Sequence, residues 1–287
     1  MKHYIFIAVI CALAAFSMTS CTNNIKLPTK EQRENLKAMH EYRDSEKWGK
    51  VVEQDKGSEA FNTLTTHGNV EIVYTQDSVY SVKVYGNEKA IDTYLFSYNT
   101  NQEGSIDLNI YCQGAEFNRL HNGAISKDTP AITVFVTSPK LEGITTYGAG
   151  DIQIKNDLKQ DANLNIYIAG AGDLDINDIE VDQLSITIDG AGDLDIKKAV
   201  CQGNADIKIN GAGDLDAKLK SANTRLEIDG AGDAKIDVNC NELHALCKGV
   251  GNIKLKGECN KLYKNDNLMG SVDSRNLKVN DKIEDNK

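Results

Sequence analysis

Residues 190–233 read GAGDLDIKKAVCQGNADIKINGAGDLDAKLKSANTRLEIDGAGD, and they contain the turn Gly-Ala-Gly-Asp three times. The turn begins at Gly190, Gly211 and Gly230, so it recurs about every 20 residues. Repeats of roughly 20 to 50 residues are typical of solenoids, in which each repeat is one coil that buries its apolar side chains against its neighbours. This stretch therefore predicts a solenoid.

The repeated turn continues in both directions from this stretch. Two earlier copies end at Asp151 and Asp173, and two degenerate copies, Gly249-Val-Gly-Asn252 and Gly270-Ser-Val-Asp273, come later. Successive first glycines are 19 to 22 residues apart. Residues 148–279 are therefore expected to form the regular β-helix repeats.

Apolar and polar residues alternate on both sides of each turn. Four and six residues after the first glycine, the coils carry two apolar columns: Ile152, Leu174, Leu194, Leu215, Ala234 and Ile253, then Ile154, Ile176, Ile196, Ala217, Ile236 and Leu255. A period of two is typical of a strand with one buried face and one wet face. Two short strands per coil predict an all-β fold, a right-handed parallel β-helix, because crossover connections are almost always right-handed. An antiparallel sandwich is the alternative, but it does not explain a turn that recurs in register.

Residues 57–147 are also rich in strand patterns but have no regular period. Residues 68–74 and 79–85 predict a hairpin-like pair of strands, and residues 106–111 and 132–137 predict two more. We expect this irregular β-rich portion to form the first coils or a cap that protects the open end of the solenoid.

The N-terminus has the pattern of a secretory signal. Residues 1–20 place Lys2 before an apolar run and a small-residue stretch, and Cys21 follows directly. This arrangement resembles the lipobox of bacterial lipoproteins. The resemblance implies that Cys21 is the lipid attachment site and that the protein is anchored to the outer membrane of the cell envelope, in either its periplasmic or its surface leaflet. An ordinary secreted protein is the alternative. Residues 21–56 are then expected to contain the lipidated cysteine followed by a charged tether or helix. Residues 280–287 are expected to form a polar C-terminal tail.

Acidic residues outnumber basic ones, 42 to 32, which gives a net charge of −10. Nucleic-acid binding needs clustered lysine and arginine to displace counterions from phosphates. This balance therefore argues against a nucleic-acid partner.

A row of aspartates is predicted along the turn edge: Asp151, Asp173, Asp193, Asp214 and Asp233. Such a row could bind Ca²⁺, which prefers several carboxylate oxygens. Alternatively, each carboxylate accepts a backbone N–H group in its own turn. The spacing differs from that of calcium-binding β-rolls, which favours the second interpretation, so no metal or cofactor is expected.

Cys240 and Cys259 each lie ten residues after the first glycine of their coils. They are therefore predicted on adjacent rungs, about 4.8 Å apart, which is close enough for a disulfide. Two stacked core thiols are the alternative.

Several motifs in order resemble a known family. They are residues 61–64, 68–76, 80–84 and 132–141, followed by the serial Gly-x-Gly-Asp turns. This order is similar to the "putative auto-transporter adhesin, head GIN domain" family, DUF2807, over about residues 57–279. The resemblance implies a right-handed β-helix on a bacterial envelope lipoprotein with a role in adhesion, and it brings no catalytic residues.

The sequence contains no nucleophile elbow, phosphate-binding loop or metalloprotease motif. We therefore expect a non-enzymatic, lipid-anchored envelope protein that presents a β-helix face for adhesion or scaffolding, with a glycan or an envelope or extracellular protein as partner. One alternative is a polysaccharide-degrading enzyme that uses Asp173, Asp193 and Asp214 with Lys197. Another is a periplasmic accessory protein that binds envelope partners. The exposed rows of aspartate and lysine that follow the turns fit either a solvated surface or a recognition face.

Overall fold

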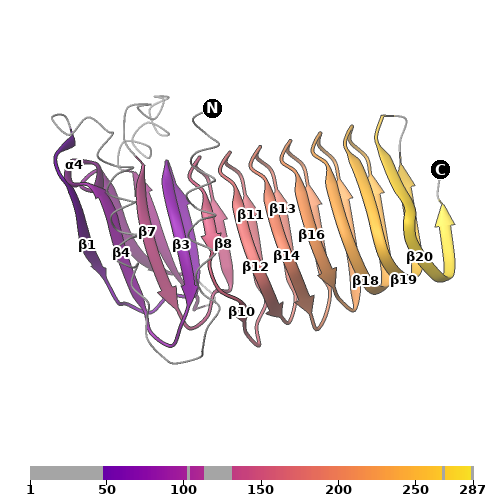
Figure 1. Ribbon diagram of the computed structural model, residues 1–287, viewed down its shortest axis with the longest axis horizontal. Helices are drawn as coiled ribbons and strands as arrows, with labels where there is room; N and C mark the ends of the chain where they lie inside the picture. The colour runs from indigo at the N-terminus through magenta and orange to yellow at the C-terminus, as the bar shows by residue number, and fades with distance from the viewer. Residues whose placement is uncertain (1–47, 102–103, 113–130, 267–268, 286–287) are drawn as a thin grey trace.

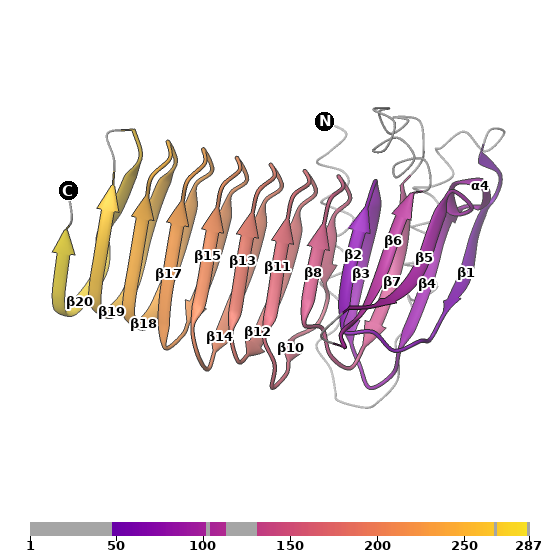
Figure 2. The same cartoon turned by 180° about the vertical axis from the view of Figure 1, so that it is seen from behind.

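The computed structural model describes residues 48–101, 104–112, 131–266 and 269–285. The described chain consists of twenty strands and one short helix, α4 (Glu88–Ile91). The strands form two facing layers along one axis, with the repeated turns joining the layers (Figures 1 and 2). The predicted all-β solenoid of about 20-residue coils is confirmed.

We call the two layers face A and face B. In spatial order, face A contains β1 (Val51–Gly57), β4 (Ser81–Asn87), β7 (Ile132–Ser138), β3 (Val70–Gln76), β9 (Ile152–Ile154) with β10 (Leu158–Lys159), β12 (Leu174–Val181), β14 (Leu194–Cys201) and β16 (Leu215–Lys220). Face B contains β5 (Tyr94–Thr100), β6 (Ile106–Cys112), β2 (Thr63–His67), β8 (Gly143–Thr146), β11 (Leu164–Ile168), β13 (Leu184–Ile188), β15 (Ala205–Ile209) and β17 (Asn223–Ile228). The last three strands, β18 (Ala234–Cys247), β19 (Asn252–Asp266) and β20 (Ser271–Asp285), pass from face A to face B.

Equivalent residues of successive coils are direct partners in the parallel ladders. Leu174 pairs with Leu194, Leu194 with Leu215, and Leu215 with Ala234. The two apolar columns predicted after the turns are at most 4% exposed. The core is therefore a stack of like side chains between the two faces, which is the arrangement that the repeat predicts.

The glycines of the turns are required by close stacking of one coil on the next. A Cβ atom on Gly192 would lie 2.1 Å from the carbonyl oxygen of Gly172, and one on Gly170 would lie 1.8 Å from that of Gly148. Neither Gly170 nor Gly192 has a positive φ. Contact between coils therefore selects glycine at these turns, rather than a special backbone conformation.

The predicted hairpin of residues 68–74 with 79–85 is wrong. Strand β7 lies between β3 and β4, parallel to β3 and antiparallel to β4. The reason is that β3 belongs to a coil, so both of its edges pair with parallel strands, β7 on one side and β9 on the other. The two further strands predicted in this region are confirmed as β6 and β7.

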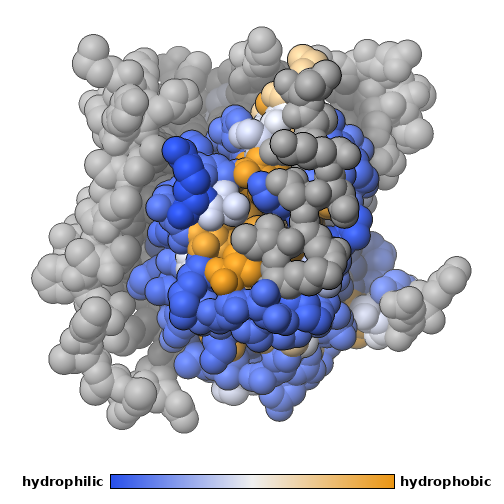
Figure 3. All heavy atoms as spheres, turned by 90° about the vertical axis from the view of Figure 1, so that its right-hand side faces the viewer, coloured by the Kyte–Doolittle hydropathy of each residue, from blue (hydrophilic) through white to orange (hydrophobic). Residues whose placement is uncertain are grey.

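The N-terminal end differs from the rest of the solenoid because antiparallel strands cover it. Strand β5 pairs with β6 on face B, and β4 and β1 extend face A beyond β7. At the opposite end, β20 pairs with β19 alone among the described strands. Figure 3 looks onto that end and shows apolar side chains at its centre with hydrophilic ones around them. Within the described residues, no helix is long and apolar enough to cross a membrane.

Candidate functional site on face A

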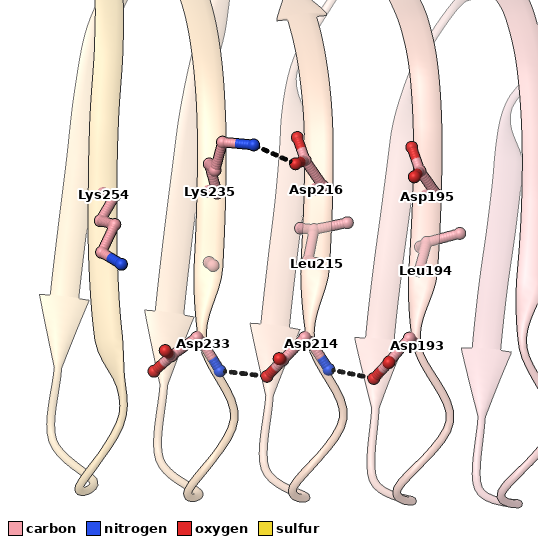
Figure 4. A pocket seen from close by; sticks show the side chains of 10 residues that line it. Asp193, Leu194, Asp195, Asp214, Leu215, Asp216, Asp233, Lys235 and Lys254 are labelled. Carbon is pink, nitrogen blue, oxygen red and sulfur yellow. Dashed lines mark hydrogen bonds and ion pairs between the residues drawn. The ribbon is translucent and has the colours of Figure 1, made fainter.

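Two columns of charged side chains follow the turns on face A. The first, which we call the turn column, contains the five predicted aspartates: Asp151, Asp173, Asp193, Asp214 and Asp233. The second, the strand column, lies two residues further on and contains Asp175, Asp195, Asp216, Lys235 and Lys254, which are successive register partners. Figure 4 shows part of both columns, from Asp193 to Asp233 in the turn column and from Asp195 to Lys254 in the strand column.

Each carboxylate of the turn column accepts a hydrogen bond from the next coil. The backbone N–H of Asp193 donates to Oδ1 of Asp173 at 2.9 Å, and that of Asp214 donates to Oδ1 of Asp193 at 2.8 Å. The same contact recurs at Asp173 to Asp151 (3.0 Å), Asp233 to Asp214 (2.7 Å) and Asn252 to Asp233 (2.7 Å). The turn column therefore ties the coils together.

This bonding differs from the predicted bond within each turn. The acceptor and donor lie 19 to 22 residues apart in sequence, because stacking places one turn above the next. Like charges this close repel one another, and the amide donors offset the repulsion. Within the described part of the chain, no group of three or more histidine, cysteine, aspartate or glutamate side chains could hold a metal ion.

The strand column is strongly acidic at its N-terminal half. Desolvation raises the pKa of Asp175, and the neighbouring Asp195 raises it further. The pKa of Asp195 is raised by desolvation and by Asp216, while Lys235 opposes the shift. Asp216 forms an ion pair with Lys235 (Figure 4). The two columns line an open groove of about 340 Å³ that crosses β14, β16, β18 and β19.

The constellation considered for catalysis is only partly assembled. Asp173, Asp193 and Asp214 lie together, but each uses one oxygen to accept a backbone N–H group. Lys197 lies on β14, four residues after Asp193 of the preceding turn, which is about 13 Å at the usual rise per residue. The acidic groove can accept hydrogen bonds from hydroxyl or ammonium groups.

A second groove of about 470 Å³ lies further along the same strands of face A. Its charged lining consists of Lys198, Lys218, Lys220, Lys278, Asp237 and Glu258. Sequence reasoning predicted exposed rows of aspartate and lysine after the turns but missed this groove. The β14 strand has a bulge between Ile196 and Ala199, and Lys197 and Lys198 are both exposed there. The sequence feature that indicates this bulge is the length of the coil, which has 21 residues from Gly190 to Gly211, whereas the neighbouring coils have 20 and 19.

Face B carries aromatic rings that stack on one another. The rings of His67 and Tyr147 are stacked with centroids 4.7 Å apart, and Tyr147 meets Tyr167 edge-on at 5.9 Å. The Tyr167 hydroxyl donates to Asp189 at 2.8 Å. These rings contact one another, although Tyr147 remains 48% exposed. Face A carries the two charged grooves, so we take it as the candidate site.

The predicted cysteine pair is in register. Cys240 of β18 and Cys259 of β19 are direct partners, both are buried, and neither is disulfide-bonded. Burial raises the pKa of Cys259 to about 11 and also raises that of Cys240. Cys21, the predicted lipid attachment site, lies outside the described residues.

The family described as "putative auto-transporter adhesin, head GIN domain" matches residues 60–234 and 196–283 of this chain. The chain belongs to this family. A putative adhesin from Bacteroides fragilis shares 22% sequence identity with it, with a TM-score of 0.59, over 83% of this chain and 97% of that one. A putative lipid binding protein from Parabacteroides distasonis shares 17% identity, with a TM-score of 0.57, over 83% and 98% of the two chains. No curated protein matches the chain.

Membership of the head GIN domain family covers the solenoid and most of its N-terminal cap. The two solved structures share the fold, and at these identities the likeness extends to the fold alone. The family description names an adhesin-like role. A function for the charged grooves of face A must therefore be argued from their own chemistry.

Proposed function

We propose that this protein is a non-enzymatic, lipid-anchored protein of the bacterial outer membrane that presents face A of its solenoid for adhesion or scaffolding. The observation that carries the proposal is the form of face A, where two open charged grooves cross successive coils. Solenoids create extended binding surfaces because each coil adds the same groups at a fixed spacing. A long, exposed and repeated surface suits a large ligand better than a small substrate.

The stiffness of this surface also supports the proposal. Backbone ladders, stacked turns and the aspartate bonds of the turn column hold each coil to the next. The backbone that carries these charged groups is positioned before binding, so less backbone entropy is lost when a contact forms. Adhesion or scaffolding gains from many weak contacts held in fixed positions.

The anchor is the second part of the proposal. A lipidated Cys21 with several acyl chains would attach the protein to a membrane in an effectively permanent way. Residues 21–47 would then span from the lipid to Trp48, which packs against the hydrophobic core of the domain.

Metabolic labelling with a palmitate analogue tests the anchor. We expect the wild-type protein and Asn23→Ala to be labelled and to fractionate with outer membranes, and Cys21→Ala to be unlabelled and soluble. Asn23→Ala is the matched control, because it changes a residue just after the attachment site and keeps the thiol. Equal labelling of Cys21→Ala would contradict the anchor.

The adhesive role is tested by attachment of whole cells to glycan-coated and matrix-protein-coated surfaces. We expect cells that lack the gene to attach less than wild-type cells, and the wild-type gene to restore attachment. Incubation of purified protein with uronic-acid polymers should leave the chain length of the polymer unchanged. Cleavage that disappears in Asp193→Asn would contradict the non-enzymatic proposal and favour the polysaccharide-degrading alternative.

A further inference from the structure

We propose that the second groove of face A, which we call the lysine groove, binds an acidic polysaccharide. The inference rests on the proposed function, because it names the ligand class for the face that the protein presents. The groove is lined by four lysines and two carboxylates, which gives it a positive charge within a chain of net charge −10. A local charge opposite to that of the whole molecule marks where an anion is favoured.

Two of the four groove lysines have no carboxylate partner within ion-pair distance among the described residues. Glu258 pairs with Lys278 at 3.0 Å, and Asp237 pairs with Lys256 at 3.5 Å. Within the described residues, no carboxylate lies within ion-pair distance of Lys218 or Lys220. These two ammonium groups are therefore available to an anionic ligand.

The bulge in β14 concentrates the lysines. It turns both Lys197 and Lys198 outward, next to Lys218 on β16, and the single ion pair there joins Lys198 to Asp178 at 3.9 Å. Bulges commonly re-aim a side chain beside a binding site. Like charges on neighbouring strands destabilise a sheet, so a bound anion would relieve the repulsion.

The shape of the groove fits a linear chain. Its lining residues come from β14, β16, β18, β19 and β20, so the groove runs along the solenoid axis. Neighbouring strands are about 4.8 Å apart, which makes this run about 19 Å long, enough for several sugar units. The groove lysines lie on β14, β16 and β20, with Asp237 of β18 and Glu258 of β19 between them, so a polymer several units long can place negative charges at both ends of the run.

The other groups in the groove fit a sugar. The Asp237 and Glu258 carboxylates can accept hydrogen bonds from hydroxyl groups, while the lysines donate to carboxylate or sulfate groups. Val200 and Gly257 form part of the floor, where the C–H face of a sugar ring could pack. A Cβ atom on Gly257 would lie 2.2 Å from the carbonyl oxygen of Val238, so this part of the floor can hold no side chain.

The acidic half of the strand column restricts which anionic ligands can bind at the lysine groove. Asp175, Asp195 and Asp216 lie on the same face and would repel a second row of negative charge. A flat anionic membrane or a nucleic-acid duplex would meet these aspartates as well as the lysines. A single acidic chain can follow the lysine groove and avoid them.

The test uses the full-length mature protein in detergent, with polygalacturonate as the probe. We expect saturable binding that weakens as salt rises, and no binding to neutral dextran. Lys218→Gln/Lys220→Gln should bind about tenfold more weakly, and Asp195→Asn more tightly, because the first removes attraction and the second removes repulsion. Lys208→Gln on face B is the control and should bind like the wild type. Unchanged melting temperatures would show that the variants are folded.

Several results would overturn the proposal. These are absent binding, equal weakening in Lys208→Gln, equal binding to polyglutamate, or binding only to vesicles that contain phosphatidylglycerol. Binding by purified protein does not depend on where the protein lies in the cell. Failure here would therefore leave the proposed display on the envelope intact, whereas failed labelling or attachment would overturn that display and leave the groove chemistry standing.

Discussion

The backbone amide of Asp214 donates a hydrogen bond to Oδ1 of Asp193, 2.8 Å away on the preceding coil. The contact makes one side chain both a surface charge and a link between coils. Because it recurs along the turn column, a row of carboxylates that would otherwise repel one another stabilises the stack.

Replacing Asp193 should separate these two effects. Asp193→Ala removes the acceptor for the Asp214 amide and should lower the free energy of unfolding by about 1 to 2 kcal/mol. Asp193→Asn keeps an oxygen acceptor and removes a repulsive charge, so it should cost much less. Urea unfolding measures both, with Asp206→Ala on face B as a control expected to change stability by less than about 0.5 kcal/mol. Equal losses in Asp193→Ala and Asp206→Ala would show that the bond contributes nothing.

The raised pKa of Asp175 predicts a stability effect that depends on pH. Because the folded-state pKa lies above the ordinary value of 3.8, the native state binds more protons, and stability falls as pH rises through the folded pKa. Thermal unfolding at pH 7 should therefore give Asp175→Asn a free energy of unfolding about 0.5 kcal/mol higher than that of the wild type. Below pH 3 the two proteins should be equally stable. Asp178→Asn, which loses the contact with Lys198, should show no such gain. A gain for Asp175→Asn that persists below pH 3 would contradict the electrostatic origin.

The turn glycines should tolerate no side chain. Gly192→Ala would place a methyl group 2.1 Å from the Gly172 carbonyl oxygen, so we expect a loss of about 1 to 3 kcal/mol. Ala191→Ser is the control, because Ala191 is exposed in the same turn and should accept a hydroxyl group with little change. Thermal unfolding followed by circular dichroism measures both. A Gly192→Ala protein as stable as the wild type would mean that successive turns are not in close contact.

The buried cysteine thiols should be alkylated slowly in the folded protein. Burial raises the pKa of Cys201 to about 12 and that of Cys259 to about 11, so little thiolate is present at neutral pH. We expect iodoacetamide to modify these residues and Cys240 only after unfolding. Non-reducing mass spectrometry of protein purified from cells should then find Cys240 and Cys259 as free thiols. A linked peptide pair that contains both residues would contradict this prediction and establish the disulfide.

The repeated part of the fold follows from the sequence because each coil meets only its neighbours. The turn at Gly190 and the apolar pair Leu194 and Ile196 fix the inward columns once coils stack in register. The same stacking explains why Cys240 and Cys259 are adjacent although they are 19 residues apart. Local alternation together with a constant period was sufficient for these contacts.

The cap and the details of the charged face required the structure. No period links β3, β4 and β7, so the sequence does not show that β7 lies between the other two. The amide partner of Asp193 is one coil away, whereas Asx-turn reasoning considers only neighbouring residues. The bulge that turns Lys197 and Lys198 outward depends on where an extra residue is absorbed, which coil length alone does not locate.

Protease treatment of intact cells tests the central proposal most directly. The cells are probed for this protein after treatment, and a soluble periplasmic protein serves as the control for leakage. If face A is displayed for adhesion, the protein should be cleaved while the periplasmic control survives. Protection of this protein until the outer membrane is opened would contradict external display and favour a periplasmic accessory role.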